Sequence, residues 1–115
     1  MTSEQVIIEI PTQREECCHA AGSLEFGPNG NLFISTGDNT SPRESDGFSP
    51  SDEREGRGPF DAQKYSSNTN DLRGKILRIK PTADGYEIPK GNLFAADGSE
   101  GRPEIYVWAV EILIA

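Results

Sequence analysis

Residues 17–38 read CCHAAGSLEFGPNGNLFISTGD, and the middle of this stretch has the pattern of a β-hairpin. Leu24 and Phe26 alternate with polar neighbours, a Pro-Asn-Gly-Asn turn follows at 28–31, and apolar residues then begin a return strand. A hairpin brings the start of its first strand beside the end of its second. His19 and Asp38, which flank the two strands, are therefore expected at the same edge of the sheet.

This pairing has a chemical meaning. A carboxylate beside an imidazole fixes the tautomer of the ring and stabilises the imidazolium, which is what a general base requires. His19 and Asp38 are accordingly the candidate catalytic residues. The alternative is that His19 is a polar surface residue near a turn and that Gly37-Asp38 only ends a strand, because motifs this short are weakly specific.

The composition narrows the class of protein. The chain has 115 residues, of which 34% are hydrophobic, and a formal net charge of −8. No basic stripe is present to neutralise phosphates, so a nucleic-acid partner is not expected. There is no apolar run long enough for a membrane span and no signal peptide at the first residue.

The two cysteines, Cys17 and Cys18, are adjacent. This spacing excludes the C-x-x-C patterns of zinc ribbons and redox sites and the C-x-x-C-H pattern of haem attachment. Neighbouring cysteines can form a strained, easily reduced disulfide ring. The alternative is a pair of reduced thiols in a loop, and the sequence slightly favours it unless the protein is exported.

Further strands are expected on both sides of the hairpin, and no helix signal is convincing. The expected strands are 5–10, ended by Pro11; the two strands of the hairpin; 75–80, ended by Pro81; and 104–115. Between them, residues 39–73 form a long polar loop, with Phe48, Phe60, Tyr65 and Leu72 as its anchors. The predicted fold class is all-β: antiparallel strands forming about one blade, with a neighbouring strand, of a β-propeller.

The long loop is rich in acidic residues, which raises the question of calcium. Its oxygen-bearing side chains form two clusters, Asp46, Asp52, Glu53 and Asp61, then Asn68, Asn70 and Asp71. None of these matches the spacing of an EF-hand loop. The loop is therefore interpreted as a solvated acidic segment, and no metal ligand is assigned.

Taken in order, the motifs resemble those of the glucose/sorbosone dehydrogenases. The pieces are H-x-x-G-S-L-x-F-G-P-N-G-N-L-F-I-S-T-G-D, D-A-Q, L-R-G-K-I-L-R-I, N-L-F and R-P-E-I-Y-V, and they span residues 6–107. The resemblance implies a six-bladed β-propeller that oxidises sugars with pyrroloquinoline quinone (PQQ) and calcium. It also implies a periplasmic or secreted protein with a sugar substrate and an electron acceptor as partners.

The resemblance assigns roles to both candidate residues. His19 would be the base that takes the proton of the sugar hydroxyl while a hydride passes to the quinone, and Asp38 would hold His19. Two departures weaken the match. Ala21 replaces a family glycine, and after Val107 the chain lacks the expected Arg-Asn-Pro.

The tail 108–115 has its own hypothesis. Codons permitted for 107–115, read one base back, can encode Met-Gly-Cys-Arg-Asn-Pro-His-Arg, which contains the family's continuation. Residues 108–115 would then be an out-of-frame translation, which sequencing of the DNA tests.

The whole chain, 1–115, is thus interpreted as part of a PQQ-dependent sugar dehydrogenase-like propeller that needs its remaining blades to fold. Alone it is expected to be inactive and to bind neither PQQ nor calcium tightly. Two alternatives remain open. One is a non-catalytic propeller that binds partners or carbohydrate, and the other is a truncated gene product without its own function.

Overall fold

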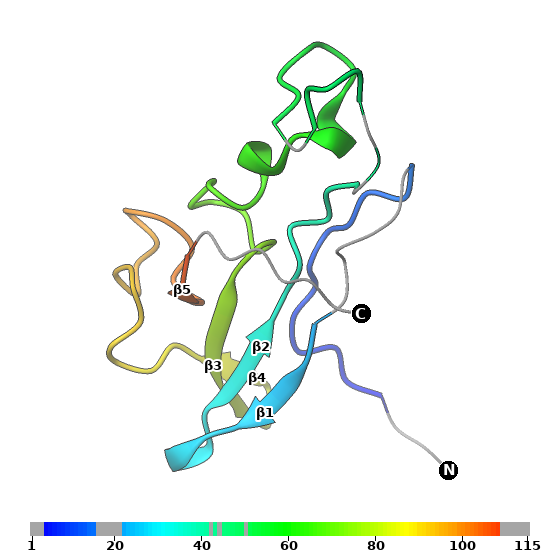
Figure 1. Ribbon diagram of the computed structural model, residues 1–115. Coiled ribbons are helices and arrows are strands. Elements are labelled where there is room, and N and C mark those ends of the chain that lie inside the picture. Colours follow the sequence, from blue (N-terminus) through cyan, green and yellow to red (C-terminus); the bar gives the residue numbers. More distant parts are fainter. Residues whose placement is uncertain (1–3, 16–21, 42, 44, 50, 109–115) are drawn as a thin grey trace.

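The expected hairpin is present and forms one side of an antiparallel sheet. The computed structural model describes residues 4–15, 22–41, 43, 45–49 and 51–108 (Figure 1). Its elements are β1 (Leu24–Phe26), η1 (Pro28–Gly30), β2 (Leu32–Ser35), η2 (Gly58–Phe60), η3 (Ala62–Lys64), β3 (Ile76–Thr82), β4 (Gly85–Glu87) and β5 (Ile105–Val107). No α-helix occurs in these ranges, so the predicted all-β class is confirmed, and the open sheet is consistent with part of a propeller.

The turn between β1 and β2 follows directly from its sequence. Asn29 has a φ of 64° and Gly30 a φ of 73°, so two consecutive residues adopt left-handed conformations. Asparagine and glycine are the residues that tolerate this backbone best, and such a turn matches the twist of the flanking strands. The register pairs Leu24 with Ile34 and Phe26 with Leu32.

β3 is the centre of the sheet. It pairs with β2 in a register that runs from Ile76 opposite Ser35 to Ile79 opposite Leu32. The end of β3 pairs with β4, and its beginning pairs with β5. Pro81 does not stop this strand as expected, because it pairs with Tyr86 across a tight hairpin. A proline lacks only the N–H donor, so it is tolerated where that edge of the strand needs no hydrogen bond.

The core lies on one face of the sheet. Leu32, Ile34, Leu77, Ile79 and Ile105 alternate onto this face, and Leu72 joins them from the loop before β3. Burial of such side chains contributes about 1.5–3 kcal/mol each. The core is therefore formed by one face of a single sheet and not between two sheets.

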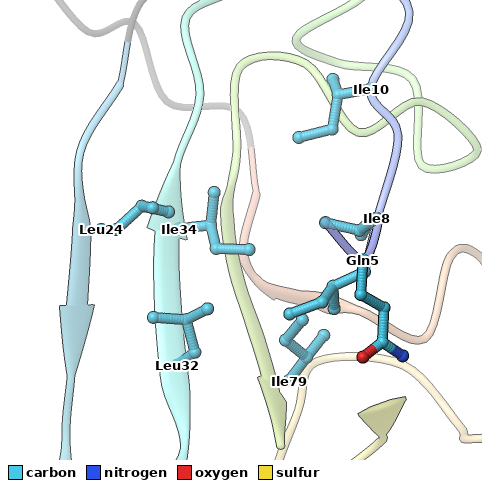
Figure 2. Close-up of a pocket in the computed structure, with 8 residues that line it drawn as sticks. Gln5, Ile8, Ile10, Leu24, Leu32, Ile34 and Ile79 are labelled. Atoms are coloured by element: carbon cyan, nitrogen blue, oxygen red, sulfur yellow. The ribbon is translucent and has the colours of Figure 1, made fainter. Parts of the chain in front are cut away.

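Residues 5–10 were expected to be a strand, and that prediction is wrong. The segment lies across the apolar face without joining the sheet, and Ile8 and Ile10 pack on the core (Figure 2). Together with the strands it borders an open apolar cavity of about 340 Å³, lined by Gln5, Ile7, Ile8, Ile10, Leu24, Leu32, Ile34 and Ile79. The apolar run predicted burial correctly but not sheet pairing.

The expected final strand is shorter than predicted. β5 covers only Ile105–Val107, and residues 109–115 lie outside the described residues. Trp108 follows the strand, where its indole N–H donates to the carbonyl oxygen of Ser67 at 3.2 Å. In the described part of the chain, no helix is long and apolar enough to cross a membrane.

Candidate functional site

Asp38 lies just beyond the end of β2 and is almost completely buried. The residue is only 2% exposed, and its Oδ1 accepts a hydrogen bond from the backbone N–H of Thr40 at 3.0 Å. This bond is the signature of an Asx turn, in which an aspartate side chain takes the place of a backbone acceptor. Asn39 between them has a φ of 59°. The turn therefore fixes one carboxylate oxygen of Asp38.

The strand end that carries Asp38 is held from the other side by the segment before β3. Thr36 Oγ1 donates to the carbonyl oxygen of Leu72 at 2.7 Å and accepts from the backbone N–H of Lys75 at 3.1 Å. The N–H of Gly74 donates to the carbonyl of Gly37 at 2.8 Å. Buried polar groups are costly unless they are paired, and here the pairing fixes residues 36–38 in place.

Lys75 is the most unusual polar residue near this site, because it is fully buried. Its Nζ donates to three backbone carbonyl oxygens, those of Tyr65 and Ser66 at 2.9 Å and that of Arg73 at 2.7 Å. These three acceptors match the three N–H bonds of an ammonium. Burial lowers the pKa of Lys75 to about 8, so the group keeps its charge at neutral pH.

A second cation, Arg73, fixes the same segment before β3. Arg73 makes two parallel bonds to Asp71, at 2.9 and 2.7 Å, and its guanidinium lies 3.7 Å from the centre of the Tyr65 ring. A planar guanidinium suits both the bidentate carboxylate and the aromatic face. Tyr65 is thus held by its carbonyl through Lys75 and by its ring through Arg73.

Sequence reasoning missed Lys75, although a signal was available. Lys75, Leu77 and Ile79 alternate along one face of a strand, and the last two are plainly core residues. A lysine in register with the core had to be buried and therefore paired. The sequence analysis places Lys75 at the start of the expected strand 75–80 but does not predict its burial.

The acidic loop differs from the expected solvated segment. Asp52 is only 1% exposed, and it accepts from Ser45, from Arg54 at 2.8 Å and from Arg57 at 3.4 Å. The hydrogen bonds from Arg54 lower the pKa of Asp52 well below its usual range. The loop, green at the top of Figure 1, is organised around this buried carboxylate.

The aromatic anchors of the loop are partly as expected. Phe60, Tyr65 and Leu72 are buried, whereas Phe48 is 50% exposed and packs under the guanidinium of Arg54 at 4.2 Å. The loop also contains η2 and η3, and the side chain of Asp61 caps η3 by accepting from the N–H of Gln63. The sequence analysis does not predict these two short helical turns.

His19, Cys17 and Cys18 lie outside the described residues, so the predicted pairing of His19 with Asp38 stays a prediction. The chain becomes described again at Gly22, where the site is tight. A Cβ added to Gly22 would lie 1.5 Å from the carbonyl oxygen of Ser35, so only glycine fits. Ser23 and Ser35 continue the contact through an N–H to carbonyl bond of 3.0 Å.

The two cations of this region are already paired within the chain. Arg73 is engaged by Asp71, and Lys75 by three backbone carbonyls. Within the described ranges, no three His, Cys, Asp or Glu residues gather as metal ligands. Lys75 therefore has no donor left for the carboxylates of PQQ, Arg73 is already paired, and the described ranges hold no carboxylate cluster for a calcium ion. What they offer is a buried, fixed carboxylate.

Comparison with known proteins shows the family of the chain. The family model for glucose/sorbosone dehydrogenase matches residues 1–109. The chain is 33% identical over 105 residues to HIPL1 protein and 31% identical over 102 residues to HIPL2 protein, both of Arabidopsis thaliana. These matches cover 80% and 77% of the chain but only 12% of each relative. The chain belongs to the glucose/sorbosone dehydrogenase family and spans about an eighth of the length of these curated relatives.

Proposed function

We propose that the chain is part of a β-propeller sugar dehydrogenase and that it contributes the proton-transfer pair, His19 and Asp38. The observation that carries this proposal is the buried Asp38 carboxylate, fixed by the Thr40 amide at the end of β2. The contact of Gly22 with Ser35 supports it, because it brings the chain just after His19 to the same end of β2. The family match provides the reaction class.

In the proposed reaction a sugar hydroxyl is oxidised to a carbonyl. The imidazole of His19 takes the hydroxyl proton, and the anionic carboxylate of Asp38 stabilises the resulting imidazolium. Burial of Asp38 strengthens this interaction, because the local dielectric constant is lower than that of water. The accompanying hydride requires an acceptor, which the family resemblance implies is PQQ.

The acceptor would be held by parts of the complete protein beyond this chain. Arg73 and Lys75 are already engaged, and we propose that the arginines for PQQ and the calcium ligands come from other blades. The isolated chain is then inactive, as the sequence predicts. A periplasmic or secreted location for the complete protein belongs to the same proposal.

The test uses the full-length product of the gene, supplied with PQQ and calcium, and measures sugar-dependent dye reduction. We expect His19→Ala to lower kcat at least about a hundredfold, the usual contribution of a general base. Asp38→Asn should lower it as well, because an amide stabilises the imidazolium less. PQQ binding, followed by its absorbance, should be retained in both variants.

Asp84→Asn is the matched control. Asp84 is an exposed residue of the β3–β4 turn, so this substitution changes the same charge without touching the strand end. Full turnover in His19→Ala would refute the assignment of the base.

A non-catalytic binding propeller is the second candidate, and Ala21 favours it because a family glycine is replaced beside the proposed base. This candidate predicts a full-length protein that binds sugar but reduces no dye when PQQ and calcium are present.

A further inference from the structure

The turn that carries Asp38 is bonded to a segment far from it in sequence. Gln13 donates to Asn39 twice: its backbone N–H to the side-chain Oδ1 at 2.6 Å, and its side-chain Nε2 to the backbone carbonyl oxygen at 3.0 Å. The two residues are 26 positions apart. Neither belongs to the motifs that carry the family resemblance, and the proposed proton-transfer pair does not account for their contact.

Asn39 is placed to act on Asp38. It is buried, has a φ of 59°, and lies between Asp38 and Thr40, whose N–H is the donor to Asp38 Oδ1. A left-handed backbone is uncommon at residues other than glycine and needs surrounding contacts to hold it. A rotation of the Asn39 backbone would carry the Thr40 N–H away from the carboxylate. The two bonds from Gln13 therefore hold the orientation of Asp38 Oδ1.

Both sides of this turn are fixed. On one side, Gln13 Oε1 accepts from the backbone N–H of Glu15 at 2.8 Å, so the amide that donates to Asn39 is itself oriented. On the other side, the N–H of Ser41 donates to the carbonyl of Pro59 at 2.7 Å. Asn39 and Ser41 are buried, so water competes poorly for these bonds.

We propose that Gln13 and Asn39 are positioning residues, which hold the Asp38 carboxylate in the orientation that stabilises the imidazolium of His19. They touch neither the sugar nor the hydride acceptor. A misplacement of about 1 Å can cost about a hundredfold in rate, so bonds that fix the carboxylate contribute to turnover through it. The role given to Asp38 rests on the proposed function, whereas the contact between Gln13 and Asn39 does not.

The test uses the full-length product of the gene, supplied with PQQ and calcium. Gln13→Met removes the bond from Nε2 and keeps the backbone bond. Asn39→Gly removes the Oδ1 acceptor and keeps the left-handed backbone, which glycine adopts readily. The double variant removes both bonds. We expect kcat to fall about threefold in each single variant and at least about tenfold in the double variant, with KM for the sugar little changed.

A second readout does not depend on turnover. Diethyl pyrocarbonate modifies only the neutral imidazole, so its rate of reaction with His19, followed by mass spectrometry of that peptide, reports the ionisation of the ring against pH. A carboxylate held beside the ring keeps it protonated to higher pH. The midpoint of the profile should therefore move down by about one pH unit in the double variant, which corresponds to the tenfold fall in kcat. A purely structural contact would not move the midpoint in the folded protein.

Gln5→Met and Asn29→Gly are the matched controls. The Nε2 of Gln5 also donates to a distant carbonyl oxygen, that of Ala83 at 3.0 Å, and Asn29 is also left-handed, with a φ of 64°. Both substitutions leave the Asp38 turn untouched and should change neither kcat nor the profile of His19.

The two readouts separate this proposal from the preceding one. If the double variant moves the profile while the wild-type protein reduces no dye, the positioning role stands and the dehydrogenase proposal fails. If dye reduction requires His19 but the double variant keeps the wild-type kcat or the wild-type profile, the positioning role is refuted. A profile that Asp38→Asn leaves unmoved also refutes it. Thermal unfolding shows which variants are folded, and the single variants apply the same test if the double variant is not.

Discussion

Single residues decide where the polar and apolar parts of the molecule meet. Lys75 continues the alternation of Leu77 and Ile79, yet it ends the apolar face with an ammonium. Three carbonyls satisfy that ammonium and so join the loop before β3 to the strand itself. Asp38 is the corresponding acidic residue just beyond the end of β2, where a local turn holds its Oδ1.

Lys75→Met should lower the free energy of unfolding of the full-length protein by about 2 kcal/mol, because it leaves buried carbonyl oxygens without donors. Urea denaturation at pH 7 measures this change. Lys80→Met on the same strand is the control and should be nearly neutral, since Lys80 is exposed.

The pH dependence of the same difference provides a second check. The folded-state pKa of Lys75 is about 8, below its ordinary value of 10.5, so the unfolded state binds more protons between these two values. The stability of the wild type relative to Lys75→Met should therefore rise as the pH increases from about 8 to about 10.5. A fall over this range would contradict the assignment of a desolvated ammonium.

At the scale of elements, local chemistry was predictable and long-range pairing was not. The β1–β2 hairpin follows from Asn29 and Gly30, which specify the turn without help from the rest of the chain. The segment 5–10 has the composition of a strand, but nothing in its residues says whether a sheet edge is available to it. β4 was missed because Pro81 was interpreted as a stop, whereas its place in the hairpin needs no donor.

The site shows the same division. Asp38 is a candidate because it directly follows a predictable strand, and its burial is what the structure adds. The sequence analysis lists Asp52 as part of a solvated loop and does not predict its burial, because its partners Ser45, Arg54 and Arg57 are brought together by turns that have no simple periodicity. The His19 assignment depends on residues outside the described ranges and stays a prediction.

Gly22→Ala should disrupt the chain just before β1 where it meets the end of β2, because the new methyl would lie 1.5 Å from the Ser35 carbonyl oxygen and the backbone cannot yield cheaply. We expect the free energy of unfolding to fall by about 2–4 kcal/mol, as is typical of a severe steric overlap. Thermal unfolding of the full-length protein measures it. Ser23→Ala, which removes only an exposed hydroxyl contact, is the control and should cost far less.

At the scale of the whole molecule, the sheet has more apolar surface than this chain covers. Leu24 is 67% exposed and Phe26 66%, and both belong to β1 on the side that carries the core. Apolar side chains exposed together in this way mark a surface that another part of a protein normally covers. This agrees with a chain that spans only 12% of the length of its relatives.

Replacing both residues, in Leu24→Ser with Phe26→Ser, should have opposite effects in two settings. The isolated 115-residue chain should become more soluble, because exposed apolar area is removed. The full-length protein should become less stable, since the same side chains would be buried by the next blade. Sedimentation and thermal unfolding measure the two effects, with Leu93→Ser, an exposed loop position, as control. Equal stability of the full-length variant would argue against blade packing on this face.

The segment 5–10 has a last consequence, for synthesis on the ribosome. Its isoleucines precede, in the order of translation, every strand that they cover. As β2 and β3 emerge, an apolar cover is therefore already present, and the nascent sheet need not wait for later parts of the chain to shield its core face. Because β1, β2 and β3 are neighbours in the same order as they are made, the sheet can grow strand by strand beneath that cover.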